Sequence, residues 1–128
     1  MKASHDFDSF IKCCATEPKK ALVIKPVPKD AREIFQLNTT DEILAFIGNN
    51  GLEKPVFINT KIWEKNPNPN EPIYVDAYEF WSLGKHCYIA FMFNPKSQIW
   101  IIKSLHLSEN TRTLGDAFKI ANIDWKTK

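Results

Sequence analysis

The stretch that decides the fold is IYVDAYEFWSLGKHCYIAFMFNPKSQIWIIKSLHL, residues 73–107. Within it, three segments (73–82, 85–93 and 98–107) alternate apolar with polar residues, and a period of two is typical of β-strands. The segments are separated by SLGK and NPKS, whose residues favour tight turns. The pattern therefore predicts a meander of three antiparallel strands.

The N-terminal region has helical periodicity instead. In SHDFDSFIKCCATE, residues 4–17, apolar side chains recur at i, i+3, i+4 and i+7, Ser4 or Asp6 can cap the helix, and Pro18 ends it. The next segment, KALVIK (20–25), is short, apolar and rich in β-branched residues. We expect it to be a strand, with an extended linker as the alternative.

Two further helices are predicted before residue 50. DAREIFQL (30–37) reads as a short helix, and TDEILAFI (40–47) as another. Thr39 and Glu42 have the spacing of a capping box, and Gly48 is placed to close the helix. The first half of the chain should therefore be mostly helical.

Three other segments complete the prediction. PVFIN (55–59) is strand-like, and WEKNPNPNEP (63–72) has too many prolines and asparagines for a regular element, so it predicts an exposed loop. Residues 114–122 have a short apolar stripe that Thr113 or Asp116 can cap, which predicts a final helix.

These elements together predict an α+β fold. N-terminal helices should pack on a twisted antiparallel sheet, made of the three-strand C-terminal meander and one or two further strands, and a short C-terminal helix should follow. The chain has 128 residues, the usual size of one domain, so we expect a single domain over 1–128. The helices should cover one face of the sheet, and the partly open face is then the functional candidate.

Charge and cysteine content limit the classes of function. The net charge is +2, which permits a nucleic-acid partner without arguing for one, although basic residues are in excess from residue 85 onward. The three cysteines are odd in number and lack metal-ligand spacing, which argues against a disulfide framework or a zinc site and favours the cytoplasm. No apolar run approaches the roughly 20 residues of a membrane helix, so we expect no membrane partner.

His106 is the first candidate for chemistry. If Asn94 faces Ser97 across the NPKS turn, the register of the last two strands pairs Lys85 with His106. A neighbouring lysine lowers the pKa of an imidazole by like-charge repulsion, which would suit a general base near neutral pH. The alternative is that both are ordinary polar residues at the end of a hairpin.

Three more side chains are candidates, each with a structural alternative. Glu79 lies among aromatic residues, where a carboxyl pKa tends to rise, and is either an acid–base partner or an edge-strand charge. Lys103 shares a face with Ile101 and Leu105 in regular alternation, and is either a cation in the cleft or a snorkelling side chain. Arg112 precedes the predicted last helix, where a phosphate could bind, although turn arginines are often simply solvated.

Helices followed by a meander, together with QIWIIKSLHLSENTR at residues 98–112, resemble the barnase–EndoU–colicin–RelE group of small bacterial ribonucleases, which includes toxins. The resemblance implies a metal-independent endoribonuclease without a cofactor, which cleaves RNA by attack of the 2′-hydroxyl on the adjacent phosphorus. It also implies a cognate antitoxin or immunity protein as a partner. The residues that would inherit catalytic roles are His106, Glu79 and Lys85, and those that would bind RNA are Lys103, Arg112, Tyr78 and Trp100.

A non-enzymatic function competes with this reading. A small α+β domain with aromatic strands and an exposed Asn/Pro loop would serve equally well as a binding module, such as an immunity or antitoxin-like protein or a phage-encoded interaction protein. The two hypotheses differ in whether purified protein cleaves RNA in the presence of EDTA.

Overall fold

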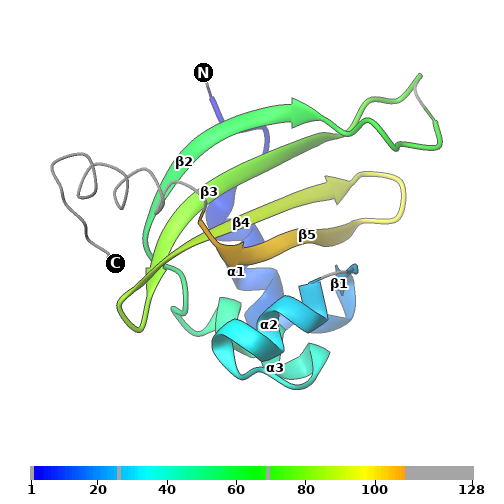
Figure 1. Cartoon of the computed structure of the whole chain (residues 1–128). Coiled ribbons are helices and arrows are strands. Elements are labelled where there is room, and N and C mark those ends of the chain that lie inside the picture. The colour runs from blue at the N-terminus through cyan, green and yellow to red at the C-terminus, as the bar shows by residue number, and fades with distance from the viewer. Residues whose placement is uncertain (1, 26, 69, 109–128) are drawn as a thin grey trace, which may run out of the picture.

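The computed structural model describes residues 2–25, 27–68 and 70–108, and it has the predicted α+β fold. Three helices lie on one side of a curved five-stranded sheet (Figure 1). The elements in chain order are α1 (Phe7–Thr16), the 3₁₀ turn η1 (Pro18–Lys20), β1 (Ala21–Val23), α2 (Val27–Phe35), α3 (Thr40–Gly48), β2 (Glu53–Ile62), β3 (Tyr74–Ser82), β4 (Lys85–Asn94) and β5 (Ile99–Leu107).

The sheet has the strand order β1-β5-β4-β3-β2. Strands β2 to β5 are antiparallel neighbours, which confirms the predicted meander and extends it by β2. The short strand β1 pairs with β5 in parallel. This pairing differs from the antiparallel sheet that the sequence predicts. The sheet is therefore mixed, because the N-terminal strand returns to the far edge of the meander instead of joining β2.

The helix boundaries follow from local capping. The Asp6 side chain accepts a hydrogen bond from the backbone N–H of Ser9 at the start of α1, and the predicted capping box of Thr39 and Glu42 is present at the start of α3. α2 begins at Val27, earlier than the predicted residue 30. The predicted helix over 114–122 lies outside the described residues.

The core lies between the helices and one face of the sheet. Phe10 of α1 stacks on Phe91 of β4 with ring centroids 3.9 Å apart, and both side chains are fully buried. Phe80, Ile89 and Leu105 from β3, β4 and β5 are fully buried in the same cluster. Aromatic side chains dominate this layer, and they pack the helices closely against the sheet.

A buried carboxylate joins the N-terminal residues to the sheet. Asp76 of β3 has no exposed surface, and its two carboxylate oxygens accept hydrogen bonds from the backbone N–H groups of Ser4 (3.0 Å) and His5 (2.8 Å). The His5 ring also contacts the backbone oxygen of Tyr74 at 2.7 Å. A buried carboxylate is stable only when its oxygens are hydrogen-bonded, so these contacts fix the entry to α1.

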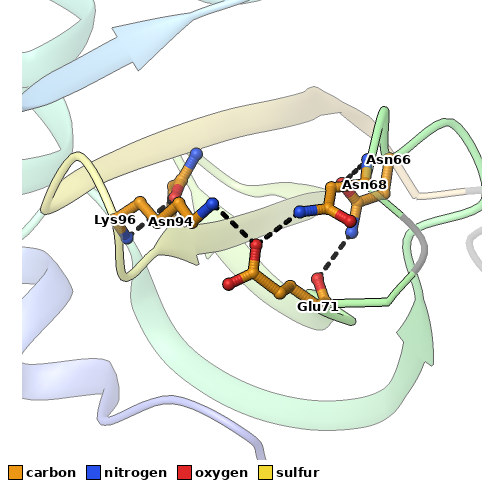
Figure 2. Close-up of polar contacts among 5 residues, drawn as sticks. All are labelled: Asn66, Asn68, Glu71, Asn94 and Lys96. Carbon is orange, nitrogen blue, oxygen red and sulfur yellow. Dashed lines mark hydrogen bonds and ion pairs between the residues drawn. The ribbon is translucent and has the colours of Figure 1, made fainter.

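The irregular loop predicted over 63–72 is held by its own side chains. Figure 2 shows Glu71 at the centre of this cluster. Its carboxylate pairs with Lys96 of the β4–β5 turn at 2.8 Å and accepts a hydrogen bond from Asn68, and its backbone oxygen accepts one from Asn66. The exposed ion pair contributes at most about 1 kcal/mol, but the set of contacts ties the β2–β3 loop to the neighbouring hairpin.

We predict that Asp76→Ala destabilises the fold by about 2–4 kcal/mol, because the substitution removes a buried charged acceptor and leaves the backbone N–H groups of Ser4 and His5 without it. Urea denaturation of the purified variant measures the change. Glu33→Ala removes an equal charge from an exposed position on α2 and should change stability by no more than about 0.5 kcal/mol. Equal midpoints for the two variants would show that the carboxylate does not hold the N-terminus.

Candidate functional site

The face of the sheet that points away from the helices contains a hollow of about 900 Å³. It crosses the sheet from the end of β1 to β2 and is bounded by the start of the β2–β3 loop. The residues that line the hollow are Ile24, Lys25, Asn59, Lys61, Ile62, Trp63, Glu64, Lys65, Val75, Ala77, Tyr88, Ala90, Lys103 and Ser104. Its volume is in the range of small-ligand sites.

One cross-strand row forms the floor of the hollow. Asn59 pairs with Ala77, Ala77 with Ala90, and Ala90 with Ser104, so the row crosses β2, β3, β4 and β5. These residues alternate with core residues such as Ile89, and therefore point to the other side of the sheet. The sheet surface is recessed here because two alanines occupy its centre.

The rim of the hollow is cationic. Four lysines (Lys25, Lys61, Lys65 and Lys103) and one acid (Glu64) are among its lining residues. Lysines from three separate parts of the chain thus surround one recess, although the whole chain has a charge of only +2. Such a focused positive field favours an anionic ligand.

The register of β4 and β5 explains why Lys103 reaches the hollow. Ala90 pairs with Ser104 and Phe91 with Ile102, so Lys103 is an extra residue in β5 and forms a β-bulge. Ile102 faces the core before the bulge, and Leu105 faces it afterwards. The bulge therefore reverses the alternation, and the prediction that Lys103 shares a face with Leu105 was wrong.

The predicted pairing of Lys85 with His106 was also wrong. Asn94 pairs with Ile99 rather than with Ser97, since the turn between the strands is longer than assumed, and the bulge adds a further shift. Tyr88 is the residue that pairs with His106. Lys85 instead pairs with Ser82 on β3 and donates a hydrogen bond from Nζ to the backbone oxygen of Ile34 in α2 (2.7 Å). The Lys85 ammonium is thus directed to the helix layer.

His106 lies beside the hollow, on the same face as Ser104. Its ring stacks on Tyr88, a lining residue, with centroids 4.9 Å apart and an interplanar angle of 13°. Nδ1 lies 2.6 Å from the backbone oxygen of Leu107. A carbonyl oxygen can only accept, so Nδ1 carries the hydrogen, and in the neutral ring Nε2 keeps its lone pair. The His106 side chain is half-buried.

Glu79 lies on the same face of the sheet as His106, but its carboxylate contacts His86 and Ser108. Its carboxylate lies 3.5 Å from Nε2 of His86 and accepts a hydrogen bond from the Ser108 hydroxyl at 2.8 Å. The His86 ring stacks on Trp81 with centroids 4.8 Å apart. His86 is not among the residues singled out from the sequence, and its diagonal position across β3 and β4 identifies it as a partner of Glu79.

The remaining predicted binding residues lie elsewhere. Tyr78 and Trp100 are buried in the core on the helix side, where both rings contact Phe91, so neither is available to stack a nucleobase. Burial, together with nearby carboxylates including that of Asp76, raises the pKa of Tyr78. The aromatic residues at the hollow are Tyr88 and Trp63. Arg112 lies outside the described residues.

Sequence reasoning did not identify the lysines of β2 and its following loop. Lys61 and Lys65 lie far in sequence from the predicted site and become part of it only because β2 joins the meander. One signal was present: Ala77 and Ala90 are small residues at the centres of strands made of bulky ones. Two small residues that lie side by side on neighbouring strands can indicate a recess in the surface of a sheet.

Across the described part of the chain, no group of three or more His, Cys, Asp or Glu side chains is arranged to hold a metal ion. The helices within that same part include none that is long and apolar enough to cross a membrane. Comparisons of the chain with models of protein families, with curated proteins and with solved structures gave no significant match.

The three cysteines are free thiols, and burial suppresses their ionisation. Burial raises the pKa of Cys14 to about 12 and that of Cys87 to about 11, and it raises the pKa of the half-buried Cys13. A thiolate is the reactive form, and at pH 8 a thiol with a pKa near 11 is ionised in about one molecule in a thousand. None of the three is suited to act as a nucleophile.

We predict that Cys14 and Cys87 resist iodoacetamide at pH 8 in the native protein and react once guanidinium unfolds it. Because folding raises the pKa values of both thiols, the stability they contribute is present below pH 9 and is lost as the pH rises toward about 11 for Cys87 and about 12 for Cys14. Mass spectrometry of the alkylated protein counts the modified sites. Rapid native labelling of Cys87 would contradict its position in the sheet core.

Proposed function

We propose that the protein is a small metal-independent endoribonuclease of the toxin type, with its reaction centre beside the hollow. The observation that carries this proposal is the 2.6 Å contact of His106 Nδ1 with the Leu107 carbonyl oxygen, from which we assign the hydrogen to Nδ1. The neutral ring then offers Nε2 as a proton acceptor at the edge of a recess surrounded by lysines.

The reaction needs a base, a cation and an acid. In the proposed mechanism His106 Nε2 takes the proton of the 2′-hydroxyl as the 2′-oxygen attacks phosphorus and the bond from phosphorus to the 5′-oxygen breaks. Lys103 stabilises the charge that develops on the phosphoryl oxygens. Stacking of His106 on Tyr88 limits rotation of the imidazole, which favours a reproducible geometry for the base.

The leaving 5′-oxygen requires a proton, and we assign its donor to the pair of Glu79 and His86. Glu79 pairs with Tyr88, and Tyr88 pairs with His106, so the acid and the base lie in one row on either side of an aromatic ring. Neighbouring strands are about 4.8 Å apart, which separates the two backbones by about 10 Å. Side chains that lean toward each other over this distance can contact one phosphodiester.

A nuclease of this type would act in the cytoplasm and would be controlled by a cognate antitoxin or immunity protein. Free thiols at all three cysteines accord with a reducing compartment. Several large apolar side chains are exposed at the end of the sheet where β3 turns into β4, among them Leu83 (79% exposed) and Trp81 (37% exposed). These side chains also favour the second candidate function, a binding module that acts without catalysis.

We predict that the purified protein cleaves total RNA in EDTA, and that His106→Ala lowers the cleavage rate by about 10²-fold or more, the usual worth of a general base. The thermal midpoint should change little, since the ring is half-buried and makes one hydrogen bond to the backbone. Gel analysis of a time course measures the rate. His5→Ala removes a histidine on the helix side of the sheet and should retain cleavage.

Two results would count against this proposal, the first against nuclease activity and the second against the role of His106. An absence of cleavage by the unmodified protein would favour the binding module, and cleavage that persists in His106→Ala would exclude this residue as the base.

A further inference from the structure

We infer that the hollow is a subsite for one unpaired nucleobase of a single-stranded RNA, and that Asn59 contributes to recognition of that base. This inference rests on the proposed function, because it names the form of RNA that the reaction centre receives. It adds to that function the floor of the hollow and its β2 side, where Asn59 and Lys61 have no role in the proposed reaction.

The floor of the hollow is recessed. Ala77 and Ala90 line it and yet have only 3% and 2% of their surface exposed, so the floor is recessed below the surrounding side chains. A planar group can enter a recess with an alanine floor, whereas a flat sheet of large side chains would only offer a surface to lie on. A volume of about 900 Å³ leaves room for a nucleoside.

The floor of the hollow has a polar side chain at each of its two ends. Asn59 and Ser104 are the first and last members of the row that contains the two alanines. An asparagine amide offers a donor and an acceptor side by side, which matches the edge of a nucleobase. A hydroxyl can serve as either. An apolar ligand would leave both side chains without a function in the hollow.

The rim supplies groups for the backbone and for stacking. Lys25 and Lys103 lie at the β1 and β5 side of the hollow, and Lys61 and Lys65 lie at its β2 side, so phosphates on both sides of an inserted base can meet an ammonium group. Trp63 and Tyr88 provide aromatic surface for stacking. Among the described residues that line the hollow, Glu64 is the one acid, and it reduces the positive charge without cancelling it.

The same features select single strands over duplexes. In an A-form duplex the bases are stacked and paired, and the edges that a side chain would read are not accessible to a recess in a protein surface. A base in a single strand can leave the stack at a small cost and enter the hollow. We therefore expect loops and unpaired segments to be the substrates.

Fluorescence anisotropy tests this inference in the His106→Ala background, where the RNA stays intact. The probes are labelled eight-nucleotide homopolymers of A, C and U, and a duplex RNA of the same length. The single strands should bind at least about tenfold more tightly than the duplex, and the three homopolymers should differ in affinity. Lys61→Glu should weaken all of them by about tenfold, since it replaces a phosphate contact with a repulsive charge.

Two variants test the recess itself. Ala90→Val fills the floor with a residue that suits a strand and should weaken single-strand binding by about tenfold, and Asn59→Ala should bring the homopolymers to within about threefold of one another. Lys12→Glu makes the same charge change as Lys61→Glu on an exposed position of α1 and should leave binding unchanged. Thermal denaturation checks folding, and if Ala90→Val does not fold, the Asn59 and Lys61 variants decide.

The outcomes separate this inference from the proposed function. Binding with the expected pattern supports the subsite even if the unmodified protein does not cleave RNA. Equal affinity for duplex and single strand overturns the subsite, as does binding that Asn59→Ala and Lys61→Glu leave unchanged, even if cleavage is observed. A complete absence of RNA binding overturns it as well.

Discussion

The carboxylate of Asp76 is the polar contact on which the arrangement of the two layers depends. It is fully buried in β3 and accepts hydrogen bonds from the backbone N–H groups of Ser4 and His5. These bonds fix the chain just before α1, so that Phe10 stacks on Phe91 and the helices cover this face of the sheet. Because the helices cover one face of the sheet, the opposite face is the one that can bind a ligand.

The bulge at Lys103 determines which side chains that second face displays. Without the extra residue, strict alternation from Trp100 and Ile102 would direct His106 toward the helices. With it, Leu105 enters the core, and His106 and Lys103 lie on the open face beside the hollow. Bulges are common next to functional sites because they redirect a side chain without interrupting the sheet. The one extra residue therefore lets β5 place Leu105 in the core and also place His106 on the face where the proposed reaction occurs.

Different parts of the open face serve different roles in the proposed function. His106 and the pair of Glu79 and His86 flank Tyr88 and are assigned to proton transfer, while the lysine rim and the alanine floor are assigned to RNA. Lys103 lines the hollow and lies near His106 on the same strand, so it joins the two parts. The start of the β2–β3 loop completes the rim, and the ion pair of Glu71 with Lys96 joins this loop to the neighbouring hairpin (Figure 2).

The sequence by itself determined the helices, the meander and the α+β class, because capping residues and apolar periodicity act over a few neighbouring residues. Thr39 with Glu42 is an example. The tertiary structure alone decided the parallel pairing of β1, the bulge, and the directions of Lys85 and His106, since strand register depends on turn length and on packing between distant segments. The tertiary structure also decided that Tyr78 and Trp100 lie in the core. It likewise decided that Lys25, Lys61 and Lys65 line the same hollow. A site assembled from several strands has no local pattern, because its residues are neighbours only after the sheet has formed.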